Sequence, residues 1–236
     1  MSAVAARAEP SRLLLATLMV LTVVSGMVDA VSYLGFGHVF TANMTGNVVL
    51  LGFAAAGAKG FSAPASLTSL GAFVVGAICA GRLCLHVASR RRWLLLAMAI
   101  EGLLTGATAI VGATAPAPVG TGWPRFTMIA ILAFAMGVRN STVRRLGVPD
   151  VTTTVLTMTL TGLAADSSLA GGDNQRSGRR VLAVIAMFAG ALVGAVIYLH
   201  QGVAWPLAIV ALLVLATATA FGLHPASRML DVRDDG

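Results

Sequence analysis

The stretch Phe40-Thr-Ala-Asn-Met-Thr-Gly-Asn-Val48 decides how this chain must fold, because it is polar within an otherwise apolar sequence. Its polar side chains are Thr41, Asn43, Thr45 and Asn47. A second polar stretch, Thr152-Thr-Thr-Val-Leu-Thr-Met-Thr-Leu-Thr161, follows in the second half of the chain. Polar side chains are costly in lipid, so two such clusters in a membrane protein need a reason. We interpret them as two halves of one site, to which the second stretch contributes Thr153, Thr154 and Thr157.

The composition indicates a polytopic helical membrane protein. Hydrophobic residues make up 57% of the chain and charged residues 11%, and the mean hydropathy is +0.88. Charged residues account for about a quarter of an average soluble domain, so this chain is strongly depleted in them. Long apolar runs recur along its whole length. We therefore expect a single membrane domain over residues 1–236, with the lipid bilayer as its main partner.

The net charge of +7 is carried almost entirely by arginine. In a soluble protein this balance would suggest a nucleic-acid partner, but here the arginines flank apolar segments and report membrane topology. No nucleic acid is therefore expected. Cys79 and Cys84 lie in one apolar segment and are interpreted as small packing residues. Because no His, Cys and carboxylate cluster has the spacing of a metal site, we expect neither a metal nor a cofactor.

Six apolar segments are long enough to cross a bilayer as helices. They cover residues 13–34, 65–89, 93–113, 126–143, 181–200 and 205–223. Two shorter polar segments, 41–56 and 152–165, are either crossings or re-entrant. If both are re-entrant, Arg90–Arg92 and Arg176–Arg180 fall on the side of the termini, and only Lys59 and Arg125 fall on the other.

The positive-inside rule favours the re-entrant arrangement. It predicts six spans and two re-entrant half-helices, with cytoplasmic tails at residues 1–12 and 224–236.

The two halves of the chain match each other. Gly26 aligns with Gly137, Gly76-Ala77 with Gly190-Ala191, and Trp93 with Trp205, with only small gaps. Repeat one covers about 13–113, a polar linker 114–125, and repeat two about 126–223. Because each half has an odd number of crossings, the halves must be oppositely oriented, as in many secondary transporters. We predict an all-α protein with a 3+3 inverted-topology repeat, in which the first re-entrant segment enters from outside and the second from the cytoplasm.

This geometry places two helix N-termini near the bilayer midplane. A non-helical run before residue 42 can reach the middle of a hydrocarbon core about 30 Å thick. A helix from Ala42 to Ala56 then returns to the starting surface at about 1.5 Å per residue. Thr41 or Asn43 would be its N-cap. Unpaired N–H groups at such N-termini favour negative charge, which points to a small polar or anionic solute.

The residues also resemble a known family. Gly26-Met-Val-Asp-Ala30 leads to Phe40-Thr-Ala-Asn-Met-Thr-Gly-Asn47, and Gly137-Val-Arg-Asn140 leads to the Thr-rich segment. This pattern is similar to that of the YoaK family, a bacterial inner-membrane family whose function is uncharacterised. The resemblance covers nearly the whole chain and implies a six-span protein of the bacterial inner membrane. The chain departs from it at Thr157-Met158, where the family often carries Thr-Gly.

Three ionisable residues within or beside the spans have two interpretations each. Asp29 in the first span is either functional or a brace for the helix break at Gly35. Glu101, near the centre of the third span, is a candidate proton carrier or a carboxyl hydrogen-bonded to a neighbouring Ser or Thr. Its repeat equivalent is the apolar Leu213. His38 beside the first polar stretch is a candidate for a pH-sensitive contact or an ordinary polar residue.

Arg139 and its neighbour Asn140 lie in the fourth span. An arginine inside a membrane needs a partner or a water-filled cavity because it is always charged. Arg139 either pairs with Asp29, helps to bind an anionic solute together with Asn140, or extends toward the cytoplasmic face.

We therefore expect a secondary transporter, with a structural or partner-binding membrane subunit as the alternative. An enzyme would need a nucleophile–base pair or a metal cluster, which the sequence does not offer. Faces of small residues, such as Gly190/Gly194, favour internal packing over dimerisation and leave a homo-oligomer open.

Overall fold

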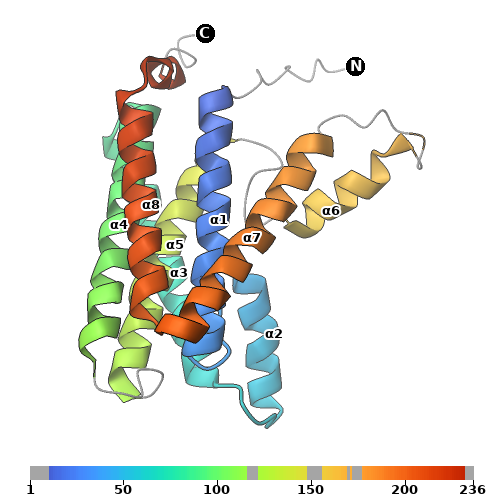
Figure 1. Ribbon diagram of the computed structural model, residues 1–236, viewed down its shortest axis with the longest axis vertical. Helices are drawn as coiled ribbons and strands as arrows, with labels where there is room; N and C mark the ends of the chain where they lie inside the picture. The colour runs from blue at the N-terminus through green and yellow to red at the C-terminus, as the bar shows by residue number, and fades with distance from the viewer. Residues whose placement is uncertain (1–10, 116–121, 148–155, 169–170, 172–176, 232–236) are drawn as a thin grey trace.

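The computed structural model describes residues 11–115, 122–147, 156–168, 171 and 177–231 (Figure 1). These residues form α-helices and short 3₁₀-helices, and no strand occurs among them. In chain order the elements are α1 (Arg12–Gly35), α2 (Met44–Ala55), α3 (Ala63–Leu83), η1 (Cys84–His86), α4 (Arg90–Thr114), α5 (Gly122–Leu146), α6 (Leu156–Ala165), α7 (Ser177–Gln201), α8 (Ala204–Leu223) and η4 (Pro225–Leu230).

Six of these helices are long and apolar enough to cross a membrane, namely α1, α3, α4, α5, α7 and α8. The predicted all-α fold with six spans is therefore confirmed. The two polar segments form shorter helices, α2 with 12 residues and α6 with 10. The fourth span is longer than expected. The sequence predicted it over residues 126–143, but α5 continues through Arg144 and Arg145 to Leu146, since basic residues are favourable in the last turn of a helix.

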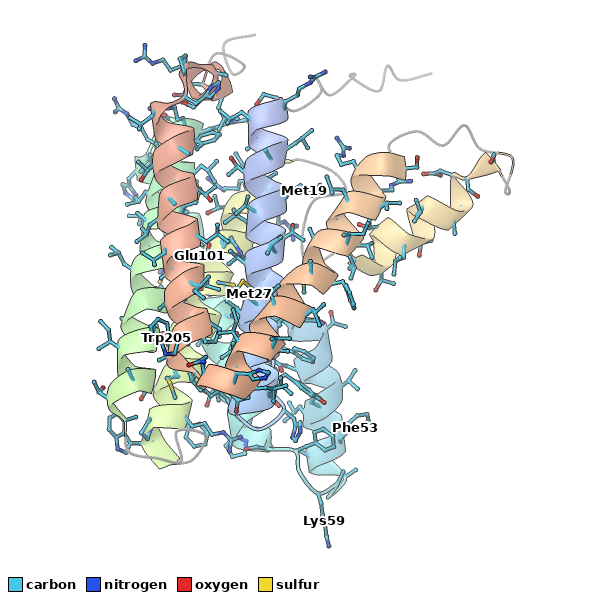
Figure 2. The ribbon with its side chains drawn as sticks, viewed as in Figure 1. Met19, Met27, Phe53, Lys59, Glu101 and Trp205 are labelled. Carbon is cyan, nitrogen blue, oxygen red and sulfur yellow. The ribbon has the colours of Figure 1, made fainter. Side chains whose placement is uncertain are left out.

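The helix ends divide the molecule into a basic end and an opposite end. α1, α4 and α7 begin at the basic end, and α5 and α8 finish there, so that α1 begins where α8 ends (Figure 1). This end carries Arg12, Arg90–Arg92, Arg144, Arg145, Arg179 and Arg180. The opposite end carries Lys59, at the tip of the α2–α3 loop (Figure 2), and Arg125 near the start of α5.

Glycines bring α1 and α7 into backbone contact. A Cβ at Gly26 would lie 2.7 Å from the backbone nitrogen of Ala191, and a Cβ at Gly190 would collide with the backbone of Val23. A Cβ at Gly194, one turn after Gly190, would lie 2.7 Å from the Cα of Met27. Small residues allow this approach, which increases packing contact between helices in lipid. The expected internal use of the Gly190/Gly194 face is thus confirmed.

The same arrangement occurs between α3 and α5. A Cβ at Gly137 would lie 3.0 Å from the backbone nitrogen of Ala77, and a Cβ at Gly76 would collide with the backbone of Phe134. Four of the glycines at these two crossings are the ones that pair in the comparison of the two halves, namely Gly26 with Gly137 and Gly76 with Gly190. Each crossing joins a helix of the first half to a helix of the second.

The segment after α8 closes over the start of α4. The backbone N–H of Arg91 donates to Oδ1 of Asp231 at 3.0 Å, and the Ser89 hydroxyl donates to Oδ2 at 2.7 Å. Partial burial would raise the pKa of Asp231, but these hydrogen bonds and the charges of Arg91 and Arg92 outweigh it and lower the pKa below its ordinary value. Asp231 is therefore a carboxylate at neutral pH and caps α4.

Candidate functional site

Asp29 holds the non-helical connection between α1 and α2 inside the bundle. Its Oδ1 accepts hydrogen bonds from the backbone N–H of Thr41 at 3.1 Å and of Ala42 at 2.8 Å. The Asp29 carboxyl is buried, as is Thr41. Backbone N–H groups away from water need an acceptor, and a carboxylate supplies a strong one. Of the two roles expected for Asp29, these hydrogen bonds agree with the brace, which holds the chain after the helix break at Gly35.

A second set of contacts fixes the same connection to α2 and α3. Oδ1 of Asn47 accepts from the Phe40 N–H at 2.9 Å, and Nδ2 of Asn47 donates to the Phe40 carbonyl at 2.7 Å. Nδ2 also donates to the Ser69 hydroxyl at 3.0 Å, and Ser69 itself donates to the Phe40 carbonyl at 2.7 Å. The side chain of Asn47 is thus occupied in positioning the connection, although the sequence suggested it as a solute ligand.

Asn43 and Thr45 are the polar side chains of the first stretch that remain exposed. Asn43 is the N-cap of α2, as expected, and its Oδ1 accepts from the N–H of Gly46 at 3.4 Å. The hydroxyl of Thr41, by contrast, is buried and has no partner among the described residues.

The length of α2 fits a half-crossing. At 1.5 Å per residue its 12 residues rise about 18 Å, roughly half of a bilayer core. In Figure 1 α2 starts partway along the bundle and runs to the opposite end. Its N-terminus, which Asn43 caps, therefore lies at an intermediate depth between the two ends of the bundle.

The second polar stretch is described only in part. Thr153 and Thr154 lie outside the described residues, and Thr157 is an exposed residue in the first turn of α6. α6 runs toward the basic end, opposite in direction to α2 (Figure 1). α2 packs against α3 and α6 against α7, so different helices hold the two polar stretches.

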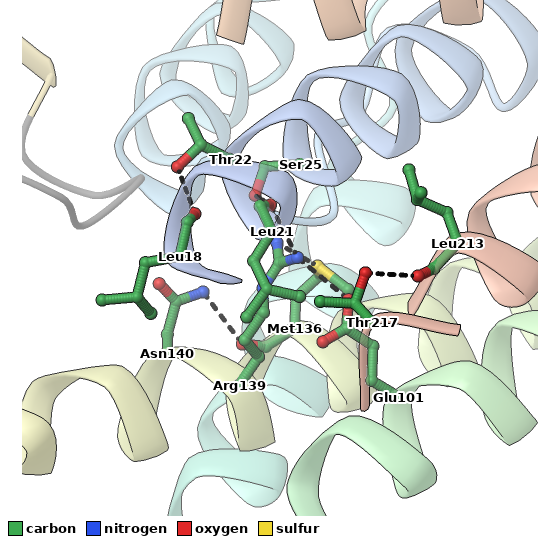
Figure 3. A network of polar contacts seen from close by, with 10 residues as sticks. All are labelled: Leu18, Leu21, Thr22, Ser25, Glu101, Met136, Arg139, Asn140, Leu213 and Thr217. Atoms are coloured by element: carbon green, nitrogen blue, oxygen red, sulfur yellow. Dashed lines mark hydrogen bonds and ion pairs between the residues drawn. The ribbon is translucent and has the colours of Figure 1, made fainter. Parts of the chain in front are cut away.

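Arg139 forms a buried ion pair with Glu101 (Figure 3). Nη1 of Arg139 lies 2.9 Å from Oε1 of Glu101, and the two side chains are 4% and 0% exposed. Nη1 also donates to the Leu21 carbonyl at 3.1 Å, and Nη2 donates to the Ser25 hydroxyl. The guanidinium thus connects α5 to α4 and α1. One role considered for Arg139 was an ion pair with Asp29. Arg139 does form an ion pair, but its partner is Glu101.

This pairing also revises the picture of Glu101 and of anion binding. The hydrogen bond expected from a neighbouring Ser or Thr is replaced by one from Arg139. Oε2 of Glu101 and the hydroxyl of Thr105 are buried and without a partner in the part of the chain that the structure describes. Because Glu101 neutralises Arg139, the arginine presents no net positive charge to a solute in this conformation.

His38 and Asn140 each contact a backbone carbonyl. Nδ1 of His38 lies 3.0 Å from the Gly60 carbonyl, and the ring packs edge-on against Tyr33 at the opposite end of the bundle. His38 adopts a φ of 58°, which is uncommon for a residue other than glycine. Nδ2 of Asn140 donates to the Met136 carbonyl at 2.9 Å, one turn earlier in α5.

Two contributors to these networks had not been expected as partners. Ser69 of α3 fixes the Phe40 carbonyl, and Ser25 of α1 fixes Arg139. Ser25 lies four residues before Asp29 in the first span, on the same helix face, and this spacing is the sequence signal that could have pointed to it. Ser69 is a buried polar residue in an apolar span, and that placement was its only sequence signal.

Replacing Asp29 distinguishes its brace role from proton binding. We expect Asp29→Ala to lower the free energy of unfolding by about 1–3 kcal/mol, because it leaves two buried N–H groups without an acceptor. Asp29→Asn retains an oxygen acceptor at the same place and should retain most of the stability. Thermal and denaturant unfolding in detergent measure both variants. Equal losses in the two variants would contradict the brace.

These observations define a class of protein, a multi-pass helical membrane protein with a braced half-helix and a buried ion pair in its core. The chain belongs to the family described as Protein of unknown function (DUF1275), which matches residues 17–220. It is 34% identical over 157 residues to the UPF0700 transmembrane protein YoaK of Bacillus subtilis (strain 168). That match covers 64% of this chain and 66% of the relative, and it confirms the resemblance noted in the sequence. No solved structure matches the chain.

Proposed function

We propose that this protein is a secondary transporter of a small polar or anionic solute, and that the N-terminus of α2 forms part of its site. One observation carries the proposal: a half-length helix begins partway between the two ends of the bundle, and Asn43 and Thr45 at its start are exposed. Asp29 holds the connection before it at two backbone N–H groups. Non-helical backbone at membrane depth is tolerated where it is buried in protein or lines a cavity. Transporters use such broken helices to bind solutes.

The paired glycine crossings support an inverted repeat. Gly26 meets Ala191 where α1 crosses α7, and Gly137 meets Ala77 where α5 crosses α3. In the register of the two halves these contacts are equivalent, because Gly26 corresponds to Gly137 and Ala77 to Ala191. The opposite directions of α2 and α6 agree with the same symmetry (Figure 1). Two halves related in this way can exchange conformations, which is the basis of alternating access.

The charge distribution supports an orientation. By the positive-inside rule the basic end would face the cytoplasm, together with the start of α1 and the end of α8. The resemblance to the YoaK family supports a location in the inner membrane of a bacterium. α2 would then enter from outside and α6 from the cytoplasm. The bound solute would meet the partial positive charge of a helix N-terminus rather than the guanidinium of Arg139, whose charge Glu101 balances. This environment suits neutral polar solutes and singly charged anions.

A non-transporting membrane subunit is the alternative, because exposed apolar residues such as Phe188 and Leu192 on α7 can also contact a protein partner instead of lipid. A catalytic role has no support among the described residues of the site, whose exposed polar groups are the Asn43 amide and the Thr45 hydroxyl. The two hypotheses differ in what Asn43 and Thr45 do, since only transport requires them.

Flux measurements in proteoliposomes test the proposal. A panel of radiolabelled small polar and anionic metabolites is offered with and without a proton gradient. We expect Asn43→Ala and Thr45→Ala each to reduce the flux of the transported solute at least tenfold, as for the loss of a solute hydrogen bond. Thr45→Ala should change thermal stability little, whereas Asn43→Ala also removes the N-cap of α2 and should cost about 1 kcal/mol. Asn47→Ala, which loosens the connection, should reduce both flux and stability. Absence of flux for every solute would favour the subunit hypothesis.

A further inference from the structure

A cavity of about 450 Å³ opens at the basic end of the bundle, well away from the N-terminus of α2. It lies between the end of α3, the start of α4 and the end of α5. Its polar lining is Arg90, Trp93, Thr142 and Arg145, and Cys84, Leu85 and Val87 complete much of the wall. None of these residues takes part in the proposed solute site, so the cavity needs a separate explanation.

The cavity corresponds to a region that is filled in the other half of the molecule. There the hydroxyl of Tyr198 donates to the Leu34 carbonyl at 3.3 Å, and its ring lies 3.0 Å from where a Cβ of Gly35 would be. In the register of the two halves, Tyr198 corresponds to Cys84 and Leu34 to Arg145. A small thiol thus replaces a phenol ring and an arginine replaces a leucine, which creates both the space and its positive charge.

The groups around the cavity match an anion. The guanidinium of Arg145, an exposed residue, donates to the thiol of Cys84, and Arg145 and Arg90 both line the cavity. Trp93 is only 4% exposed, and its indole Nε1–H has no partner among the described residues. Its counterpart in the second half, Trp205, is 61% exposed. A buried indole N–H normally finds an acceptor, so an incoming oxygen would satisfy it.

We propose that this cavity binds a phosphate group, and that its source is the head group of an anionic phospholipid. Arginine binds phosphate oxygens through parallel hydrogen bonds, and an indole N–H can donate to a further oxygen. Leu85, 72% exposed at the rim, offers apolar contact to the start of an acyl chain. Basic pockets between helices at a cytoplasmic surface suit such head groups. The proposal does not depend on transport.

Lipid-dependent thermal stability tests the site. The full chain is purified in a neutral detergent, and its unfolding temperature is followed during titration with phosphatidylglycerol or with phosphatidylcholine of the same acyl chains. We expect phosphatidylglycerol to stabilise the protein saturably. Arg145→Gln should weaken the apparent affinity about tenfold, as for loss of a charge-assisted hydrogen bond. Arg144→Gln is the matched control, because this exposed neighbour does not line the cavity.

Two further measurements separate the outcomes. Trp93→Phe removes the N–H and keeps a smaller aromatic ring, so it should weaken lipid binding several-fold. Because this buried replacement also lowers the unfolding temperature of the lipid-free protein, the concentration of lipid at half-maximal stabilisation is the measure of binding. Inorganic phosphate that stabilises as well as the lipid, with loss in Arg145→Gln, would assign the same site to a soluble phosphate and overturn the lipid source. Equal effects of Arg144→Gln and Arg145→Gln, or equal stabilisation by both lipids, would overturn the site.

Discussion

Arg139→Met is expected to lower the free energy of unfolding by about 3–5 kcal/mol, because it leaves the Glu101 carboxyl buried without its charged partner. The replacement also removes the hydrogen bonds to the Leu21 carbonyl and the Ser25 hydroxyl. Arg139 links α5, from the second half of the chain, to α1 and α4, from the first. Unfolding of the purified protein in detergent, followed by heat and by denaturant, measures the loss.

The double replacement Arg139→Met with Glu101→Leu is the control for this prediction. Removing both charges exchanges a buried ion pair for apolar packing, which is often close to neutral in stability. Leucine is already present at the equivalent place in the second half, as Leu213. We therefore expect the double variant to recover most of the stability lost by Arg139→Met. If the stability lost by the double variant equalled the sum of the losses of the two single variants, the two side chains would contribute independently, which would contradict the ion pair.

Gly76→Ala is expected to lower the free energy of unfolding by about 1–3 kcal/mol, because the added methyl group meets the backbone of Phe134 where α3 crosses α5. Gly190→Ala should have a similar effect at the equivalent crossing of α7 with α1, where it meets Val23. Both changes favour the helix locally, since alanine is the better helix former. Loss of stability can therefore arise only from the crossing.

Gly71→Ala supplies the matched control in the same helix as Gly76. A Cβ at Gly71 has no atom within 4 Å, so the change should be neutral or stabilise the protein by roughly 0.5–1 kcal/mol. Opposite signs for Gly71→Ala and Gly76→Ala are the expected result of thermal unfolding. A similar small gain at all three glycines would show that the helices can separate without cost, and would contradict the tight crossings.

The spans and the half-helices could be predicted from the sequence because hydropathy and length act locally. An apolar run that is long enough to cross the bilayer, or a polar run that is too short to cross it, can be recognised from its own residues without knowledge of the neighbouring helices. Glycines such as Gly26 and Gly190 were also recognisable, since small residues at regular spacing mark helix contacts. The N-cap of α2 was narrowed to Thr41 or Asn43 for a similar reason, because capping depends on a few adjacent residues, and the structure selects Asn43.

The partners of the buried polar groups could not be predicted in the same way. Whether Arg139 meets Asp29 or Glu101 depends on the relative depth of three helices, which only their packing decides. The clamp of Asn47 and Ser69 on the Phe40 carbonyl is likewise a tertiary contact. Its effect on function is direct, because it removes Asn47 from the candidate solute ligands and leaves Asn43 and Thr45.

The accessibility of Thr45 from the two membrane faces tests the central claim, alternating access around the N-terminus of α2, most directly and without knowledge of the solute. A Thr45→Cys replacement is made in a chain whose Cys79 and Cys84 are changed to alanine, and membrane vesicles of either orientation are treated with an impermeant thiol reagent. Ala55→Cys at the other end of α2 is the control and should react from the opposite end only. The account predicts that Thr45→Cys reacts from both faces. Reaction from one face alone would contradict it.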